Sequence, residues 1–316
     1  MRIPEAADMS QALLAALQRV IVGKEHVLQH LLLGLYSGGN ILLEDFPGLA
    51  KTLIARLVAQ VTGLAFKRIQ FTPDLLPGDI TGGFIYNQKE GEFVFRPGPL
   101  FTNLVLADEV NRAPPKTQAA LLEVMQEQQV TVEGVTYPMS APFVVLATQN
   151  PIELEGTYPL PEAQLDRFIM RLRVGYPTPE EERHILARRG ARRQEKIELD
   201  AVIDASQLLQ IQATVEHVHA SEAIERYIVS LTAATRQHTQ VQVGVSPRGS
   251  LALYQLTRAH AMIQGRDFVL PDDVKTMAPA ALAHRLLLKP ELWVRGIHAE
   301  DVIRDILERT PIPKAE

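Results

Sequence analysis

Short apolar runs alternate with helical patterns between about residues 40 and 175. The apolar runs occupy residues 41–43, 66–71, 104–107, 143–147 and 168–174. Between them, residues 49–61 and 115–128 carry apolar side chains at the spacing of an amphipathic helix. Strands that read as continuous apolar runs are typical of a parallel sheet covered by helices on both faces. The pattern predicts a doubly wound α/β domain.

Two segments depart from this rhythm by alternating apolar and polar residues. Residues 82–97 do so around a polar turn at 87–91, and residues 129–139 do so around Glu133 and Gly134. Alternation about a glycine-containing turn predicts a β-hairpin, so we expect two hairpins inserted into the α/β layout. They are candidates for moving parts, or they extend the main sheet.

Everything beyond Pro177 and Pro179 reads as helices. The expected helices are 179–189, 200–211, 221–237, 248–264, 272–284 and 299–307. The sequence therefore predicts two domains, an α/β core over 1–177 and a helical domain over 178–316. A basic run at Arg188, Arg189, Arg192 and Arg193 lies near the junction, and we expect it to be a solvated face rather than a nucleic-acid contact.

Composition narrows the function classes. The chain has 316 residues, 46% hydrophobic and 22% charged, with 32 Lys and Arg against 37 Asp and Glu, a net charge of −5. This balance argues against a protein that mainly coats phosphate backbones. The absence of cysteine excludes disulfides, zinc–thiolate sites and thiol nucleophiles. No run approaches the ~18 apolar residues of a membrane span, and the first 20 residues lack a secretory-signal pattern, so a cytoplasmic protein is expected.

The segment 44–52 lies between a short strand and a helix, where a phosphate-binding loop would stand. Lys51 would place a positive charge on the β- and γ-phosphates, and Thr52 would offer a hydroxyl to Mg²⁺. Both glycines of the GxxxxGK[ST] pattern are replaced, one by Asp45 and the other by Ala50. Pro47 and Gly48 could still supply the turn.

Two further buried strands end in polar residues. Asp108 and Glu109 follow residues 104–107, and Asn150 follows the strand that begins at Phe143. At the carboxyl edge of a parallel sheet, Asp108 can hold the Mg²⁺ shell and Glu109 can polarise an attacking water. Asn150 could hydrogen-bond the γ-phosphate or that water. Three such strand ends together favour phosphoryl transfer.

At this point the sequence resembles the MoxR group of AAA+ ATPases. The matching strings are LADEVNRAPPKTQ at 106–118, ATQNP at 147–151, LPEAQLDRF at 160–168 and VSPR at 245–248. The resemblance implies an α/β AAA+ core with a five-stranded parallel sheet and inserted hairpins, followed by an all-α lid domain. In this family such hairpins line or face a central pore.

The resemblance also implies roles for individual residues. Lys51 and Thr52 would be Walker A, Asp108 and Glu109 Walker B, and Asn150 sensor 1. ATP would contact Pro47, Gly48, Leu49, Ala50, Lys51, Thr52, Leu53 and Asp108, with Mg²⁺ at Thr52 and Asp108 and adenine near Val22 and Gly23.

Two arginines complete the implied catalytic set. Arg167 resembles the arginine finger that reaches a neighbouring subunit's γ-phosphate, unless it pairs with the adjacent Asp166, and Arg171 and Arg173 are alternative fingers. Arg248 resembles sensor 2, or is a helix-start arginine bonding a carboxylate.

The function implied is a Mg²⁺-dependent ATP hydrolase that acts as a ring, with a hexamer expected. Family members are chaperone-like remodelling machines that usually have a von Willebrand factor A domain partner and act in maturation of protein complexes or metal enzymes. The alternatives are an ATP-gated oligomeric scaffold with little hydrolysis, or a DNA-translocating ring of the same clade. The net acidity disfavours DNA.

Overall fold

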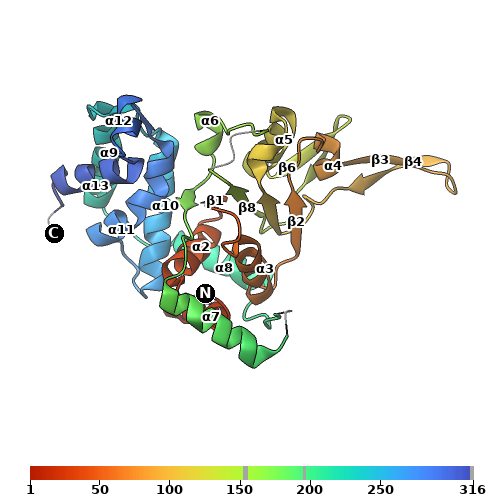
Figure 1. Cartoon of the computed structure of the whole chain (residues 1–316), viewed down its shortest axis with the longest axis horizontal. Helices are drawn as coiled ribbons and strands as arrows, with labels where there is room; N and C mark the ends of the chain where they lie inside the picture. The colour runs from red at the N-terminus through yellow and green to blue at the C-terminus, as the bar shows by residue number, and fades with distance from the viewer. Residues whose placement is uncertain (152–155, 195–196, 314–316) are drawn as a thin grey trace.

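A five-stranded parallel sheet forms the centre of the molecule in the computed structural model, which describes residues 1–151, 156–194 and 197–313 (Figure 1). The strand order is β2-β5-β8-β1-β9, and each neighbouring pair is parallel. The strands are β1 (Ile41–Glu44), β2 (Phe66–Gln70), β5 (Leu104–Asp108), β8 (Val144–Gln149) and β9 (Met170–Leu172). The α/β prediction is confirmed.

Alternate side chains of the central strands enter two separate apolar clusters. In β1, Ile41 and Leu43 pack on one face and Leu42 packs on the other. The first face is covered by α1 (Ile3–Gln18), α2 (Glu25–Tyr36) and α3 (Lys51–Val61), and the second by α4 (Pro77–Thr81) and α5 (Pro115–Glu127). Because both faces are buried, these strands read as continuous apolar runs in the sequence.

The chain order reverses between β1 and β8. From β1 the chain crosses to β2 at one edge of the sheet, whereas from β8 it crosses to β9 on the other side of β1. Ligands of open α/β sheets bind outside the carboxyl ends of the strands at such a reversal. The ends of β1, β5 and β8 meet at this edge.

Both inserted hairpins form as predicted, each as a separate antiparallel pair. They are β3 (Gly82–Asn87) with β4 (Glu92–Pro97), and β6 (Gln129–Val132) with β7 (Val135–Pro138). Neither extends the main sheet, so that alternative is wrong. The β3–β4 hairpin projects far from the body (Figure 1), and Phe95 at its base stacks on Tyr137 of β7 with ring centroids 4.0 Å apart.

The second half is mainly helical and also holds β9 and one short antiparallel strand pair. Its α-helices are α6 (Glu162–Leu165), α7 (Pro179–Arg192), α8 (Ala205–Val215), α9 (Glu222–Gln237), α10 (Pro247–Ile263), α11 (Pro271–Leu282), α12 (Glu291–Val294) and α13 (Ala299–Arg309). Two 3₁₀ turns, η1 (Val110–Arg112) and η2 (Ala283–Arg285), complete the helical elements described. The short pair is antiparallel and consists of β10 (Val241–Val243) and β11 (Leu287–Leu288), which lie between the helices that the sequence predicts.

Helix α8 starts later than expected, at Ala205 rather than near residue 200. The reason is a cap, since the Asp204 carboxylate accepts the Gln207 N–H at 2.8 Å. Buried side chains of α8, α9, α10, α11 and α13 join the cluster that covers the first face of the sheet. The apolar core is therefore continuous across residues 177 and 178, and the domain division there stays a prediction.

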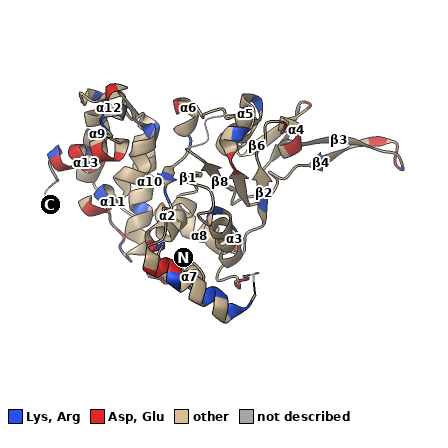
Figure 2. Cartoon of the chain, viewed as in Figure 1, with Lys and Arg blue, Asp and Glu red and all other residues tan. Residues whose placement is uncertain are grey.

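Helix α7 has an exposed basic half. None of its residues is buried, and Figure 2 shows most of its arginines gathered toward the end of the helix. Arg188 donates to the backbone carbonyls of Gln18 and Arg19 at 2.8 and 3.0 Å, which fastens the helix to the end of α1. Over the described residues, no helix combines the length and apolarity needed to cross a membrane.

Candidate nucleotide site

The loop between β1 and α3 lies at the carboxyl edge of the sheet. Gly48 and Ala50 both adopt left-handed backbone conformations, with φ of 82° and 58°. Lys51 is the first residue of α3, and its Nζ donates to the carbonyl oxygens of Asp45 and Phe46 at 2.5 and 3.1 Å. A helix start with an adjacent lysine provides N–H groups and positive charge, as an anion requires.

Asp45 replaces the first glycine of the motif and has a structural role. It is buried, and its carboxylate accepts the N–H of Phe46 at 2.9 Å and the N–H of Gly175 at 2.5 Å. The phosphate-loop candidate is therefore tied to the segment that follows β9. At the position where the motif has glycine, Asp45 therefore holds the loop in place through these two hydrogen bonds.

A pocket of about 440 Å³ brings the sequence-predicted phosphate, carboxylate and amide residues together. It is lined by Pro47, Gly48, Leu49, Ala50, Lys51, Thr52, Leu53, Arg68, Asp108, Glu109, Thr148 and Asn150. Only Arg68 and Thr148 in this set were not predicted. The pocket volume lies within the range of small-molecule sites.

The Asp108 carboxylate is held on both oxygens. Its Oδ1 accepts the Thr148 hydroxyl at 2.6 Å, and its Oδ2 accepts Nε and Nη2 of Arg68 at 2.9 and 2.7 Å. Thr148 is almost wholly buried, and its hydroxyl also accepts the backbone N–H of Glu109 at 2.8 Å. One hydroxyl therefore positions both carboxylate residues.

Glu109 has a left-handed backbone, with φ of 57°, which turns its side chain away from the direction of β5. Its Oε2 accepts Nε2 of Gln70 at 2.6 Å and pairs with Nε of Arg112 at 3.2 Å. A non-glycine residue in this conformation costs about 1–2 kcal/mol, and residues of this kind cluster at active sites.

The ligand types suit a hard divalent cation. The Thr52 hydroxyl and the Asp108 carboxylate line the same pocket, and oxygen donors are what Mg²⁺ prefers. Within the described parts of the chain, no group of three or more His, Asp or Glu side chains is placed to hold a metal by itself. Mg²⁺ is commonly bound by few protein ligands together with substrate phosphates, so these residues fit it.

Arg167 lies outside the pocket, on the turn that leads into β9. Its Nη1 donates to the carbonyl oxygen of Leu122 at 2.9 Å. The expected alternative, a pair with the neighbouring Asp166, is wrong, because Asp166 instead accepts from Arg285 and Ser246 at 2.8 Å each.

The alternative fingers are bound within the chain. Arg171 pairs with Glu44 at 3.1 Å and with Glu300 at 3.0 Å, and its side chain is only 15% exposed. Arg173 pairs with the same two carboxylates at 3.2 and 3.9 Å. Releasing Arg171 would leave buried charge unpaired, so Arg171 is poorly placed to leave its own chain.

Arg248 stands in the first turn of α10 with an exposed side chain. In the described part of the chain its guanidinium makes no hydrogen bond or ion pair, so a helix-start pair with a carboxylate is not found. Its backbone N–H donates to the Ser246 hydroxyl, which caps the helix, at 3.2 Å.

Val22 and Gly23 are not among the residues that line the pocket. Gly23 has φ of 69° and packs against Glu181 of α7, where an added Cβ would fall 1.9 Å from a carboxylate oxygen. The next residue, Lys24, donates to the carbonyl of Tyr176 at 3.0 Å, and the Tyr176 ring stacks on Phe46 of the loop with centroids 5.7 Å apart. These contacts connect the predicted adenine region to the phosphate-loop candidate.

Sequence reasoning missed Arg68, Gln70 and the role of Thr148. Arg68 and Gln70 are polar residues two apart on β2, so they share one face of that strand. In the parallel register Gln70 lies opposite Asp108. The strand register would have pointed to Arg68 and Gln70, but the register is known only once β2 is known to pair with β5.

Comparisons with known proteins agree with this geometry. A family described as "ATPase family associated with various cellular activities (AAA)" matches residues 40–170, and one described as "AAA lid domain" matches residues 233–306. The crystal structure of a Cytophaga hutchinsonii protein superimposes on this chain with a TM-score of 0.92 at 42% sequence identity, covering 99% of this chain and 97% of the other. That protein is provisionally described as an ATPase. Fold and site thus define an AAA+ ATPase.

Relatives that match this chain over nearly its whole length identify its family within the AAA+ ATPases. Chaperone MoxR1 of Mycobacterium tuberculosis is 45% identical over 94% of this chain and 80% of its own length. Protein MoxR of Methylorubrum extorquens is 30% identical over 93% and 92%. The uncharacterized protein YeaC of Bacillus subtilis is 50% identical over 94% and 92%. The chain belongs to the MoxR family of chaperone-like AAA+ ATPases.

Proposed function

We propose that this protein is a Mg²⁺-dependent ATP hydrolase. The observation that carries the proposal is the single pocket that combines Lys51 at a helix start with Asp108 and Glu109. A scaffold that only binds nucleotide has no need for a second carboxylate held beside the first. The proposal therefore favours hydrolysis over an ATP-gated scaffold.

Each pocket residue has a chemical task in this proposal. Lys51 exchanges its carbonyl partners for the β- and γ-phosphates, and the N–H groups at the start of α3 bind the same phosphates. Thr52 and Asp108 would hold Mg²⁺ together with the phosphates, and the bound ion would supply positive charge against the charge that develops in the transition state. Glu109 orients and polarises the attacking water, and Asn150 hydrogen-bonds that water or the γ-phosphate.

Hydrolysis in this proposal needs two copies of the chain. Arg167 extends from one subunit to the γ-phosphate of its neighbour, where a guanidinium is worth ~10³-fold or more in rate. Arg248 acts from the lid on its own subunit's phosphates. The support is that Arg167 lies outside its own pocket and uses one of its donors on a backbone carbonyl. A closed ring, a hexamer by family resemblance, satisfies this geometry.

The ring would remodel other proteins in the cytoplasm. We propose a partner with a von Willebrand factor A domain and a task in maturation of protein complexes or metal enzymes, carried out by a core at 1–177 and a lid at 178–316. The support is the family, together with exposed apolar side chains on the projecting hairpin, where Phe93 is 69% and Tyr86 52% exposed. Such side chains suit contact with a client polypeptide.

The experiment is steady-state phosphate release with ATP and Mg²⁺, comparing wild type with Lys51→Ala. Hydrolysis that Lys51→Ala abolishes supports the proposal. Equal and negligible rates in both proteins would leave the scaffold as the better account. Stimulation of the wild-type rate by added DNA would favour the translocating ring.

A further inference from the structure

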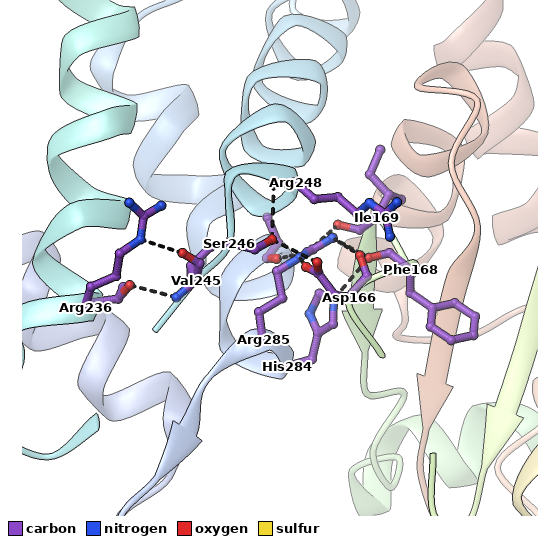
Figure 3. A network of polar contacts seen from close by, with 11 residues as sticks. Asp166, Phe168, Ile169, Arg236, Val245, Ser246, Arg248, His284 and Arg285 are labelled. Atoms are coloured by element: carbon purple, nitrogen blue, oxygen red, sulfur yellow. Dashed lines mark hydrogen bonds and ion pairs between the residues drawn. The ribbon is translucent and has the colours of Figure 1, made fainter. Parts of the chain in front are cut away.

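A buried arginine, Arg285 of η2, occupies the junction between the lid and the core. Its side chain is 2% exposed. Figure 3 shows it reaching from the lid to the chain segment just before β9. Its Nε donates to the Asp166 carboxylate at 2.8 Å, its Nη2 to the carbonyls of Asp166 and Phe168 at 3.1 and 2.7 Å, and its Nη1 to the carbonyls of Ile169, at 3.3 Å, and Ala281.

All five N–H donors of Arg285 are therefore used, four of them on residues 166–169. The neighbouring His284 adds a contact of 3.1 Å from Nε2 to the Phe168 carbonyl. A planar guanidinium with every donor satisfied has one position available to it. The segment that carries Arg167 is consequently fixed to the lid.

The same carboxylate is also joined to α10. The Ser246 hydroxyl donates to Asp166 Oδ2 at 2.8 Å and accepts the backbone N–H of Arg248 at 3.2 Å (Figure 3). Asp166 is the residue before Arg167, and Ser246 lies two residues before Arg248. A single hydroxyl thus stands between the segments that hold the two arginines.

Packing strengthens this connection. A Cβ built on Gly249, in the first turn of α10, would fall 2.9 Å from Cδ of Arg285 and 2.2 Å from Cγ1 of Val245. The helix therefore lies directly on the arginine stem. The turn before α10 is held in addition, because Val245 donates to the Thr235 hydroxyl at 3.0 Å and accepts Nε of Arg236 at 2.8 Å.

We propose that Asp166, Ser246 and Arg285 form a coupling junction that sets the position of Arg167 according to the position of α10. The inference rests on the proposed function. When Arg248 draws the start of α10 toward nucleotide in its own subunit, Ser246 and Arg285 carry Asp166 with it. Arg167 then moves relative to the neighbour's γ-phosphate. The three junction residues are positioning residues and touch no nucleotide.

Mixed assemblies isolate this effect. Wild-type subunits are combined with a tenfold excess of Glu109→Gln subunits, which still bind ATP but hydrolyse it about 10³-fold more slowly, and which can still offer Arg167 to a wild-type neighbour. The excess subunits carry, in turn, no further change, Arg167→Ala, Ser246→Ala, Ser246→Gly or Ser246→Thr. Sedimentation confirms assembly, and phosphate release per wild-type subunit is measured against ATP concentration.

Ser246→Ala in the excess subunits is expected to lower the kcat of the wild-type subunits about tenfold, the scale of one hydrogen bond to a charged group. The wild-type KM should stay unchanged, because their own pockets are intact. Ser246→Thr should restore the rate. Ser246→Gly should behave like Ser246→Ala. Glycine is a tolerated helix cap, so the lost bond to the Arg248 N–H costs little there, and the defect that the two variants share is the lost contact to Asp166.

The outcomes separate the two proposals. If Arg167→Ala lowers the neighbours' kcat but Ser246→Ala does not, the coupling junction is overturned and the proposed hydrolase stands. If Arg167→Ala itself has no effect, the finger does not act between subunits, and the junction is overturned with it.

Discussion

The phosphate-binding pocket, here the phosphate side, and the coupling junction, here the junction side, are built in different ways. The phosphate side is assembled from strand ends of one sheet, where Lys51, Asp108 and Asn150 follow three parallel strands and meet because the sheet brings them together. The junction side is assembled from side chains far apart in the sequence, such as Asp166 with Arg285. Backbone topology positions the first group, and buried polar side chains position the second.

Glu109→Gln tests the phosphate side most strongly. Removing the carboxylate charge while keeping the shape and the bond to Gln70 should lower kcat about 10³-fold, the scale of general-base catalysis. The affinity for ATP should persist, because the loop around Lys51 is unchanged. Phosphate release and nucleotide binding measured on the same sample check this. A variant that keeps most of its turnover would remove Glu109 from the chemistry.

Thr148 tests whether one hydroxyl positions both carboxylates. Thr148→Val removes the hydrogen bonds of the hydroxyl to Oδ1 of Asp108 and to the Glu109 N–H at nearly constant volume, while Arg68 still bonds Oδ2 of Asp108. We expect a decrease in kcat of tenfold to about 100-fold, since two buried hydrogen bonds are lost. Thr148→Ser, which keeps the hydroxyl, is the matched control and should stay within about threefold of wild type. Equal rates in the two variants would contradict the assigned role.

The same contrast explains what could be predicted from the sequence. Apolar runs identified the sheet, alternation identified the hairpins, and strand ends identified Lys51, Asp108, Glu109 and Asn150, because a parallel sheet brings consecutive strand ends to one edge. The full set of ten predicted pocket residues also needed the family resemblance. Arg68 and Gln70 needed the pairing of β2 with β5, which no local pattern supplies. The contact of Asp166 with Arg285 spans 119 residues, and the β10–β11 pair is only a few residues long, so neither left a periodic signal.

Buried histidines predict that the molecule loses stability in mild acid. Burial, with His26 nearby, lowers the pKa of His30 to about 4, and burial holds the pKa of His284 well below its ordinary value. Between pH 6.5 and 5 the unfolded chain binds these protons and the folded chain does not, so the free energy of unfolding falls as pH falls. Carboxylates titrate mainly below this window.

The expected slope is about 1.4 kcal/mol per pH unit for each histidine, or ~2 kcal/mol from pH 6.5 to 5. Urea unfolding across this range measures the slope. Relative to wild type, His30→Gln should reduce this slope by the contribution of one histidine, about 1.4 kcal/mol per pH unit. An identical slope in the variant would show that His30 is not the group that titrates.

The smallest effect concerns the strained loop. Ala50 adopts a left-handed backbone that glycine accepts without penalty, so Ala50→Gly should raise the free energy of unfolding by about 1 kcal/mol. The mirror control is Gly48→Ala, which should lower it by a similar amount. An alanine Cβ at that position would have no atom within 4 Å, so the cost is purely conformational. Thermal unfolding of both variants decides, and destabilisation by Ala50→Gly would contradict the argument.

The central claim is that one subunit binds ATP in its loop while its neighbour supplies Arg167, and complementation tests it most directly. Lys51→Ala subunits keep the Arg167 finger but lose the phosphate-binding lysine. Arg167→Ala subunits keep the phosphate-binding loop but lose the finger. Phosphate release is measured for each variant alone and for an equimolar mixture. The account predicts that two inactive preparations recover turnover on mixing; a mixture as inactive as its components, although co-assembled, would contradict it.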